Sequence, residues 1–362
     1  MQAAPVLPWT MRPSKLVFTM DESNLPLVSV LMPSYNHGKY IRQAVESVFA
    51  ETYRPLELIV IDDASSDDSA QTLEALHRDA PIPFSLEIFE QNQGAPTVLN
   101  RCLELARGEL ISLCASDDMH IPGGMEKLVD LLLADEKLQV AYGNGWIMEG
   151  ETQTTKQMHT DAALEFLNAT PGDAHQMMLT GSFPMWFQTG ISRASMVRAV
   201  GGWDPERKAD DGPRARRVYR YLAENGLGHA YSDVPYYIYR THESNLHKNA
   251  NKMREHILDA IDAEYPAESR SQVLYRALIR QMRVCVENDN ARDAVLMLGH
   301  LLDDIDDPQL DAYFVPRLLA FAKDNGEAVR NPESGEWVAG VAPHERVQEQ
   351  RAKIRQQRQQ IE

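Results

Sequence analysis

Apolar residues in the first half of the chain follow two alternating patterns. Short buried runs typical of strands occur at residues 27–33, 56–63, 84–90, 109–115 and 138–144. Apolar stripes with helical spacing lie between them, at residues 41–50, 97–106 and 128–133. A further helix is expected to open at Asp68, with Gln71 completing a capping box. Strands that alternate with helices in this way predict a parallel α/β sheet with helices on both faces.

The second half of the chain is less regular. Helices are expected near residues 162–168, 175–179 and 211–224, and a strand at 234–240. Residues 252–325 read as acidic helices and the last residues as a polar helix, in which Val347, Ile354 and Ile361 recur every seven positions. One apolar seam is a weak coiled-coil signal, so self-association through these helices and a solvated terminal helix both stay open.

Composition narrows the class of protein. The chain has 362 residues, enough for two or three domains, and its 43% hydrophobic content excludes disorder as the main state. Its net charge of −17 argues against nucleic acid as a partner, although a nucleotide held through a metal stays compatible with it. No apolar run is long enough for a membrane helix, and the first residues do not read as a signal peptide. The three cysteines form no metal pattern and are expected to be buried thiols, which favours a cytoplasmic protein.

Paired aspartates are the main candidates for chemistry. The chain contains six Asp-Asp pairs, so only their positions are informative. The pairs at 62–63 and 117–118 each follow a buried strand, at the sheet edge where ligands bind, within the loops 62–67 and 116–122. The pair at 67–68 is expected to cap a helix, and those at 303–304 and 306–307 to be solvated. Paired carboxylates at a strand end suit Mg²⁺ or Mn²⁺, which prefer oxygen ligands.

The order of several segments gives a family resemblance. LVSVLMPSYN at 27–36, VIDDASSDDS at 60–69, QNQG at 91–94 and LARGELISLCASDDMHIP at 105–122 resemble the nucleotide-sugar-binding half of an inverting family 2 glycosyltransferase with the GT-A fold. GISRASMVRAVGGWD at 190–204 is similar to the acceptor-side segment of that family, and YRTHESN at 239–245 to its closing strand.

The resemblance implies an α/β GT-A fold with a mixed sheet flanked by helices. The domain would span 27–250, with a nucleotide-sugar half at 27–145 and an acceptor half at 146–250. An N-terminal extension at 1–26, a helical region at 251–335 and a polar C-terminal helix at 336–362 would lie outside it.

The resemblance also implies roles on the nucleotide side. The nucleobase pocket would be lined by Pro33, Tyr35 and Asn36, with Asp63 accepting a hydrogen bond from the base. Asn92 and Gly94 would shape the loop near the diphosphate. Arg101 would bind the diphosphate or lie on a helix surface. Asp117 would contact the ribose or assist the metal, and Asp118 would ligate Mn²⁺ or Mg²⁺ directly, with His242 as a further ligand or a structural residue. His37 and His120 are expected at the surface.

On the acceptor side, the resemblance implies a general base. Asp211 would remove the proton of the acceptor hydroxyl, with Asp210 beside it, unless the two residues only cap the following helix. Trp186 and Trp203 would form an acceptor platform, with a core position as the alternative for Trp203. Two departures from the family stand out: Ala115 replaces a common acid, and GPRARRVYRYL at 212–222 replaces a helix that usually carries tryptophan.

The resulting hypothesis is a metal-dependent inverting glycosyltransferase. It would use a nucleotide-diphospho-sugar, with UDP favoured, and act on a glycan, lipid-linked or protein acceptor, as in polysaccharide biosynthesis. It would be cytoplasmic, with peripheral attachment to the inner face of the membrane left open. A sugar-phosphate nucleotidyltransferase is disfavoured because SYNHGKY at 34–40 is not Gly-rich and contains no arginine. A GT-A-fold binding or scaffold protein that works through its helical tail stays as the alternative.

Overall fold

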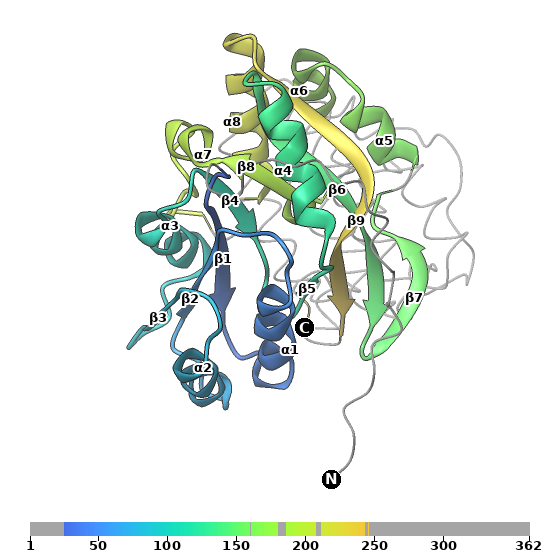
Figure 1. Cartoon of the computed structure of the whole chain (residues 1–362). Coiled ribbons are helices and arrows are strands. Elements are labelled where there is room, and N and C mark those ends of the chain that lie inside the picture. The colour runs from blue at the N-terminus through green and yellow to red at the C-terminus, as the bar shows by residue number, and fades with distance from the viewer. Residues whose placement is uncertain (1–24, 160, 180–185, 208–210, 243–244, 246–362) are drawn as a thin grey trace, which may run out of the picture.

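A mixed nine-stranded sheet forms the centre of the computed structural model, which describes residues 25–159, 161–179, 186–207, 211–242 and 245 (Figure 1). The strands lie in the order β3 (Phe84–Ile88), β2 (Leu56–Asp62), β1 (Val28–Ser34), β4 (Leu110–Leu113), β8 (Gly190–Arg193), β6 (Leu138–Glu149), β9 (Gly228–Thr241) and β5 (Met119–His120). A further strand, β7 (Thr152–Gln157), pairs with β6. The first four strands are parallel, β8 runs antiparallel to both neighbours, and β6 and β9 are parallel. The mixed sheet expected from the sequence is therefore confirmed.

Helices cover both faces of the sheet because successive strand residues point to opposite sides. In β1, Val30 and Met32 join the core formed with α1 (Gly38–Phe49), α2 (Ser69–Arg78) and α4 (Gly124–Ala134). Leu31 joins the core on the other face. That face is covered by α3 (Ala95–Leu105), α5 (Asp161–Leu167), α6 (Pro171–Leu179), α7 (Ala194–Ala199) and α8 (Asp211–Glu224). Each large apolar side chain that is fully buried here contributes about 1.5–3 kcal/mol.

The helix that follows β2 begins where the sequence predicts, but its capping is different. Asp68 is the N-cap of α2 and makes no side-chain capping bond, so the predicted capping box with Gln71 is wrong. Asp67 takes this role, because its carboxylate accepts the backbone N–H of Ser69 (3.0 Å) and that of Gly38 at the start of α1 (2.9 Å). One carboxylate therefore joins the beginnings of two helices.

Several strands have no clear pattern in the sequence or are only partly predicted by it. β5 and β8 have 2 and 4 residues, and they are held by pairing with β9 and with β4 and β6 rather than by their own composition. β9 is longer than expected, because it extends the predicted strand at 234–240 back to Gly228. Residues 1–24 of the extension predicted at 1–26 lie outside the described residues, and so do the regions predicted at 251–335 and 336–362 and Cys285.

The described residues also test the expectations about the cysteines and about membrane-spanning helices. Cys102 and Cys114 are buried and free, as predicted for them. Burial raises the pKa of the Cys102 thiol to about 12. Within the described ranges, no helix combines the length and the apolar character that crossing a membrane requires.

Candidate functional site

Two loops at the carboxyl ends of β1 and β2 are joined by hydrogen bonds. The backbone N–H of Asn36 donates to Ser65 Oγ (2.8 Å), and Asn36 Oδ1 accepts the backbone N–H of Ser66 (2.8 Å). Asn36 (φ 54°) and Ala64 (φ 60°) both adopt the left-handed conformation, which is rare for residues other than glycine. Such strain persists where surrounding contacts hold it, and it is concentrated at functional sites.

Asp63 organises the next loop. Its side chain is buried, at 3% exposure, and accepts the backbone N–H groups of Gln93 (2.6 Å) and Gly94 (2.8 Å). Asn92 donates to the backbone carbonyl of Asp63 (3.4 Å), and Gly94 has a positive φ of 85° at the start of α3. Three residues predicted to bind the nucleotide, Asp63, Asn92 and Gly94, therefore lie together. A contact between Asp63 and a base stays a prediction.

The other expected base-pocket residues differ in exposure. Pro33 is half-buried at the end of β1, whereas Tyr35 is 47% exposed. An exposed aromatic ring next to a polar loop is available for a planar ligand. The Asn36 side-chain oxygen accepts the backbone N–H and the hydroxyl of Ser66, so its clearest role is to hold the two loops together.

The two aspartates after β4 point to different surroundings. Asp118 is 2% exposed and accepts the hydroxyl of Tyr237 (2.9 Å) and the backbone N–H of Arg240 (2.8 Å). Burial, and then repulsion from Asp117, raise the pKa of Asp118 well above its usual range. Asp118 therefore connects the loop to β9, and it is not one of the side chains grouped for a metal in the described part of the chain.

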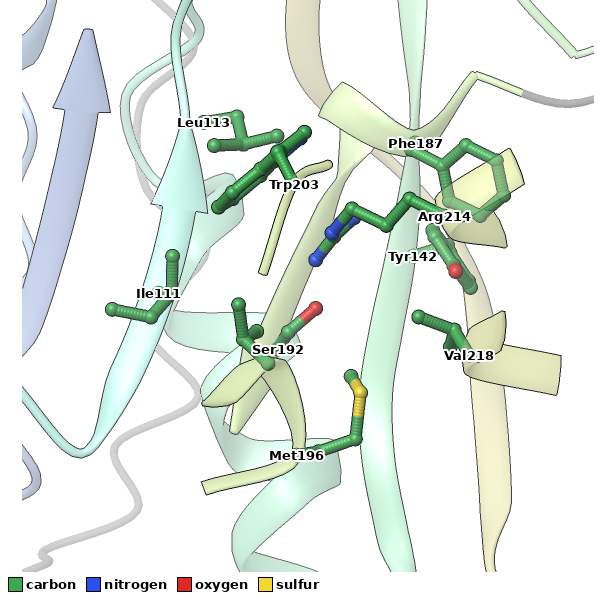
Figure 2. Close-up of a pocket in the computed structure, with 11 residues that line it drawn as sticks. Ile111, Leu113, Tyr142, Phe187, Ser192, Met196, Trp203, Arg214 and Val218 are labelled. Carbon is green, nitrogen blue, oxygen red and sulfur yellow. The ribbon is translucent and has the colours of Figure 1, made fainter. Parts of the chain in front are cut away.

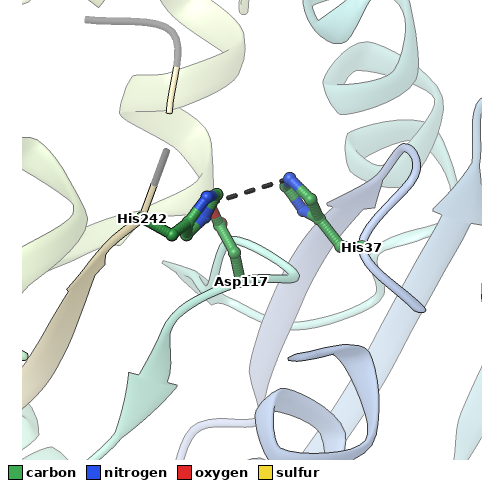
Figure 3. A group of neighbouring side chains, drawn as sticks. All are labelled: His37, Asp117 and His242. Atoms are coloured by element: carbon green, nitrogen blue, oxygen red, sulfur yellow. Dashed lines mark hydrogen bonds and ion pairs between the residues drawn. The ribbon is translucent and has the colours of Figure 1, made fainter. Parts of the chain in front are cut away.

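Asp117 lies instead beside two histidines (Figure 3). Its Oδ2 is 3.1 Å from His242 Nε2 and 3.7 Å from His37 Nε2. Burial raises the pKa of Asp117, but the His242 hydrogen bond and the nearby His37 outweigh it and hold the pKa below its usual range. The candidate ligand atoms of the three residues all lie within 4.8 Å of one another, which makes them a candidate metal group.

Arg240 is fully buried, and its hydrogen bonds hold the loop that carries Asp117 in place. Its guanidinium donates to the carbonyls of Asp117 (2.9 Å) and Gly150 (2.6 Å) and to Gln43 Oε1 in α1 (2.6 Å). These bonds fix the end of β9, two residues before His242, against the loop that carries Asp117. The sequence singled out this segment for its histidine and missed Arg240. A buried arginine is recognisable only once its partners are known.

His37 and His120 were both expected at the surface, and the structure shows one of them buried and the other partly exposed. His120 is buried, at 2% exposure, because β5 pairs with β9 and brings its ring against Tyr236 and Tyr237, so the surface prediction for it is wrong. The side chain of His37 keeps 25% exposure, but it faces Asp117 and His242 rather than open solvent. His37 is the member of the candidate metal group that sequence reasoning missed.

Arg101 lies on the surface of α3 with two acidic partners. Its guanidinium pairs with Glu87 of β3 (2.6 Å) and with Glu104 one turn along the helix (2.9 Å). This geometry favours the helix-surface alternative over a diphosphate contact.

The two tryptophans expected on the acceptor side have different surroundings. Trp203 is 2% exposed and lies under the guanidinium of Arg214, 4.3 Å from the ring centroid (Figure 2). Both residues line a small cavity of about 10 Å³, room for about one water molecule. Trp203 therefore occupies the core position that was its alternative. Trp186 is half-buried against Tyr239, with ring centroids 4.6 Å apart, and it stays a candidate for an acceptor contact.

Asp211 begins α8 and is exposed. The positive end of the helix dipole stabilises a carboxylate at this position. The departure noted in the sequence is visible here, because Arg214 and Arg216 face the interior from the same helix. Asp210 lies outside the described residues, so the choice between the two aspartates stays open.

Comparisons with known proteins agree with the family indicated by the sequence. The family profile described as Glycosyl transferase family 2 matches residues 29–196. The uncharacterised glycosyltransferase YibD of Escherichia coli K12 is 28% identical over 291 residues, which cover 71% of this chain and 78% of YibD. The chain spans only 41% and 61% of the lengths of two further curated glycosyltransferases that it matches.

Solved structures share the fold at low identity. TarS of S. aureus, residues 1–349 in complex with UDP-GlcNAc, superposes with a TM-score of 0.52 at 17% identity and covers 92% of each chain. The mannosyltransferase PcManGT of Pyrobaculum calidifontis, in complex with GDP-Man and Mn²⁺, gives a TM-score of 0.50 at 15% identity, over 92% of this chain and 86% of that one. At these identities the likeness confirms the expected GT-A fold and does not by itself assign a ligand.

Proposed function

The chain carries a family 2 glycosyltransferase domain in residues 29–196, and on that premise we propose that it transfers a sugar from a nucleotide-diphosphate donor to an acceptor hydroxyl with inversion. The observation that carries the proposal is the position of Asp117. This carboxylate lies in the loop after β4, at the sheet edge where ligands of α/β folds bind, and its described ion-pair partners are the imidazoles of His37 and His242.

The residues present fit a divalent metal. A largely buried carboxylate whose pKa is held down stays ionised, and a metal ion compensates such a charge. Asp117 and His242 would hold the ion, with Mn²⁺ and Mg²⁺ as the candidates. A bound divalent ion supplies positive charge against which a nucleoside diphosphate can depart. Asp118, first expected as the direct ligand, is assigned a supporting role because its oxygens already accept bonds from Tyr237 and Arg240.

The nucleoside would bind over the joined loops of β1 and β2. Tyr35 offers an exposed ring to the base, and Pro33 lies near the end of β1. Asp63 keeps the Gln91–Gly94 loop in place through two backbone N–H groups, and its oxygens retain lone pairs for a base N–H. A UDP-sugar is the favoured donor, supported by the UDP-GlcNAc bound in the TarS structure, which shares this fold.

The transfer itself needs a base and no covalent enzyme intermediate. Asp211 would take the proton of the acceptor hydroxyl as that oxygen forms a bond to the anomeric carbon. The bond to the diphosphate oxygen breaks on the opposite side, so the configuration of the anomeric carbon inverts. The acceptor would be a glycan, a lipid-linked glycan or a protein, with Trp186 as a contact.

The test is release of nucleoside diphosphate from a panel of UDP- and GDP-sugars, with Mn²⁺ and a mixture of glycan acceptors. Turnover by the wild-type chain that is lost in Asp117→Asn and kept in the exposed control Asp79→Asn would support the proposal. Nucleotide binding without any turnover across the panel would instead favour a binding or scaffold protein with the GT-A fold. Failure of every nucleotide to bind in any metal would remove the proposal.

A further inference from the structure

His37 lies in the loop after β1, and its ring lies edge-on to that of His242, with centroids 5.9 Å apart (Figure 3). We propose that His37 is a third protein ligand, so that the ion is held by two imidazole nitrogens and one carboxylate oxygen. This inference rests on the proposed function and deepens it, since it names the class of metal that the site takes.

The ring of His37 is held in a suitable orientation. Its Nδ1 is 2.8 Å from Ser116 Oγ, in the same loop as Asp117, and its backbone N–H donates to Ser69 Oγ (3.0 Å). An Nδ1–H that donates to the serine hydroxyl leaves the lone pair on Nε2, which faces Asp117 Oδ2 at 3.7 Å. Metal-binding histidines usually have their second ring nitrogen engaged in this way, which fixes the tautomer.

The ring of His242 is also fixed by its neighbours. Tyr40, one turn after His37 in α1, stacks on it with ring centroids 4.7 Å apart and an angle of 26°. The Asn245 amide lies 3.2 Å from His242 Nε2, and it also contacts Asp117 Oδ2 (3.5 Å) and the Arg240 carbonyl (3.3 Å). Asn245 can therefore keep hydrogen bonds when Nε2 turns to a metal.

The spacing is close to that of a closed site. Two ligand atoms that each lie about 2.1 Å from one ion are separated by at most about 4.2 Å. The atoms of His37, Asp117 and His242 lie within 4.8 Å of one another, so side-chain movements of less than about 1 Å would close the group around an ion. Rotation about side-chain bonds supplies movements of this size without any change in the backbone.

Two imidazoles change which metal is preferred. Mg²⁺ favours oxygen ligands and keeps its waters, whereas imidazole nitrogen suits the later divalent transition metals, whose affinities rise from Mn²⁺ through Co²⁺. Three protein ligands also allow binding before any nucleotide arrives. We therefore expect the metal-free protein to bind one Co²⁺ or Mn²⁺ without nucleotide, with Co²⁺ tighter than Mn²⁺ and Mg²⁺ much weaker than either.

The experiment is calorimetric titration of the full-length, metal-free protein with Co²⁺, Mn²⁺ and Mg²⁺, first alone and then with UDP, together with the visible absorption of the Co²⁺ complex. His37→Ala and His37→Gln remove the nitrogen ligand, and His77→Ala, an exposed histidine bonded to the Phe84 carbonyl, is the matched control. Both His37 variants should lose Co²⁺ affinity by about 10–100-fold or more and change the Co²⁺ spectrum, with a smaller loss for Mg²⁺ in the presence of UDP. His77→Ala should match the wild type.

A purely structural role for His37 predicts something else: equal losses for all three metals and an unchanged Co²⁺ spectrum. That result, or Co²⁺ affinity within about twofold of the wild type in both variants, would overturn the inference. The proposed function would then still stand if UDP binding kept its dependence on metal. If metals bound as expected but no nucleotide did, the proposed function would fail and the assignment of His37 would survive.

Discussion

The carboxylates of Glu57 and Asp117 lie at opposite ends of the central strands, both largely buried, and they have different kinds of charged partner. At the amino end, Glu57 of β2 accepts Ser29 Oγ (2.6 Å), the backbone N–H of Arg107 (2.8 Å) and the Arg107 guanidinium (2.6 Å). Burial raises the pKa of Glu57, but these bonds outweigh it and hold the pKa below its usual range. At the carboxyl end, the described ion-pair partners of Asp117 are two imidazoles and no arginine or lysine.

The kind of partner indicates a structural role for Glu57 and a cation-binding role for Asp117. A guanidinium is permanently charged and has a fixed donor geometry, so the Glu57 pair is complete within the protein. An imidazole is a weak base near neutral pH and a ready metal ligand, so the Asp117 group is suited to receive a cation from outside. Glu57 lies in β2 and Asp117 in the loop after β4 of the same sheet, and their partners differ in kind.

The sharpest test of this comparison is Asp117→Asn. The variant should lose metal-supported transfer by about 10²-fold or more, because several kcal/mol of charge stabilisation at the leaving diphosphate disappear with the metal. Its free energy of unfolding should fall by less than that of Glu57→Gln, because Asp117 has imidazole partners and no guanidinium partner among the described residues. Steady-state release of nucleoside diphosphate and chemical denaturation measure the two quantities. Transfer within threefold of the wild type would break the comparison.

Asp211 extends the comparison to an exposed carboxylate. Asp211→Asn should keep donor affinity but lose transfer by about 10²-fold, because the proton of the acceptor hydroxyl has no acceptor. A residue that only caps α8 would instead cost about 1 kcal/mol of stability and leave the rate intact. Single-turnover transfer, donor affinity and melting temperature on Asp211→Asn and Asp210→Asn separate these roles. Loss confined to Asp210→Asn would move the base one residue back, and normal transfer in both variants would refute it.

Asp118 should give an intermediate effect. Asp118→Asn keeps an oxygen acceptor for the Arg240 N–H, so we expect metal affinity to fall by about 10–100-fold, as for residues that orient ligands. Asp118→Ala leaves the Tyr237 hydroxyl and the Arg240 N–H without this acceptor and should also cost about 1–3 kcal/mol of stability. Metal titration and denaturation of both variants provide the check. Complete loss of metal binding in Asp118→Asn with an unchanged fold would restore Asp118 as the direct ligand.

Glu57→Gln should affect stability and nothing else. We expect a loss of about 1–3 kcal/mol near neutral pH, because a charged acceptor of four hydrogen bonds becomes neutral. The pKa of Glu57 is lowered by folding, so its contribution is present above the pKa of the unfolded chain and disappears as the pH falls through the folded value. The difference from the wild type should therefore shrink below about pH 4. Urea denaturation across pH, with exposed Glu74→Gln as control, measures this difference in stability. Any change in metal affinity in Glu57→Gln would contradict a purely structural role for Glu57.

Most strands and helices of residues 27–145 could be predicted, because each has a run or stripe of apolar residues that is buried in the core. β1 and β2 were expected to within a residue or two, and their loops carry the residues around Asp63. β5 and β8 could not be predicted, since elements of 2 and 4 residues are stabilised by partners far away in the sequence. Dependence on distant partners also limits what the sequence shows of the site.

Within the site, the sequence does not show which neighbour a side chain meets. The Asp117–Asp118 pair is visible in the sequence, but the side chain that turns inward depends on Tyr237 and Arg240, more than a hundred residues later. His37 looked like a surface residue because its partners, Ser116 and Asp117, come from another loop. The sequence leaves Trp203 open between an acceptor platform and a core position, and in the structure the guanidinium of Arg214 in α8 lies over its ring.

Calorimetric titration of UDP into the full-length wild-type chain, with Mn²⁺ and then with a chelator, tests most directly whether the carboxyl edge of the sheet is a metal-assisted nucleotide-sugar site. Binding of one UDP in Mn²⁺, weakened by about 10-fold or more in the chelator and in Asp117→Asn, is the predicted result. Equal affinity for UDP with and without metal, or no binding of UDP or GDP under either condition, would contradict it.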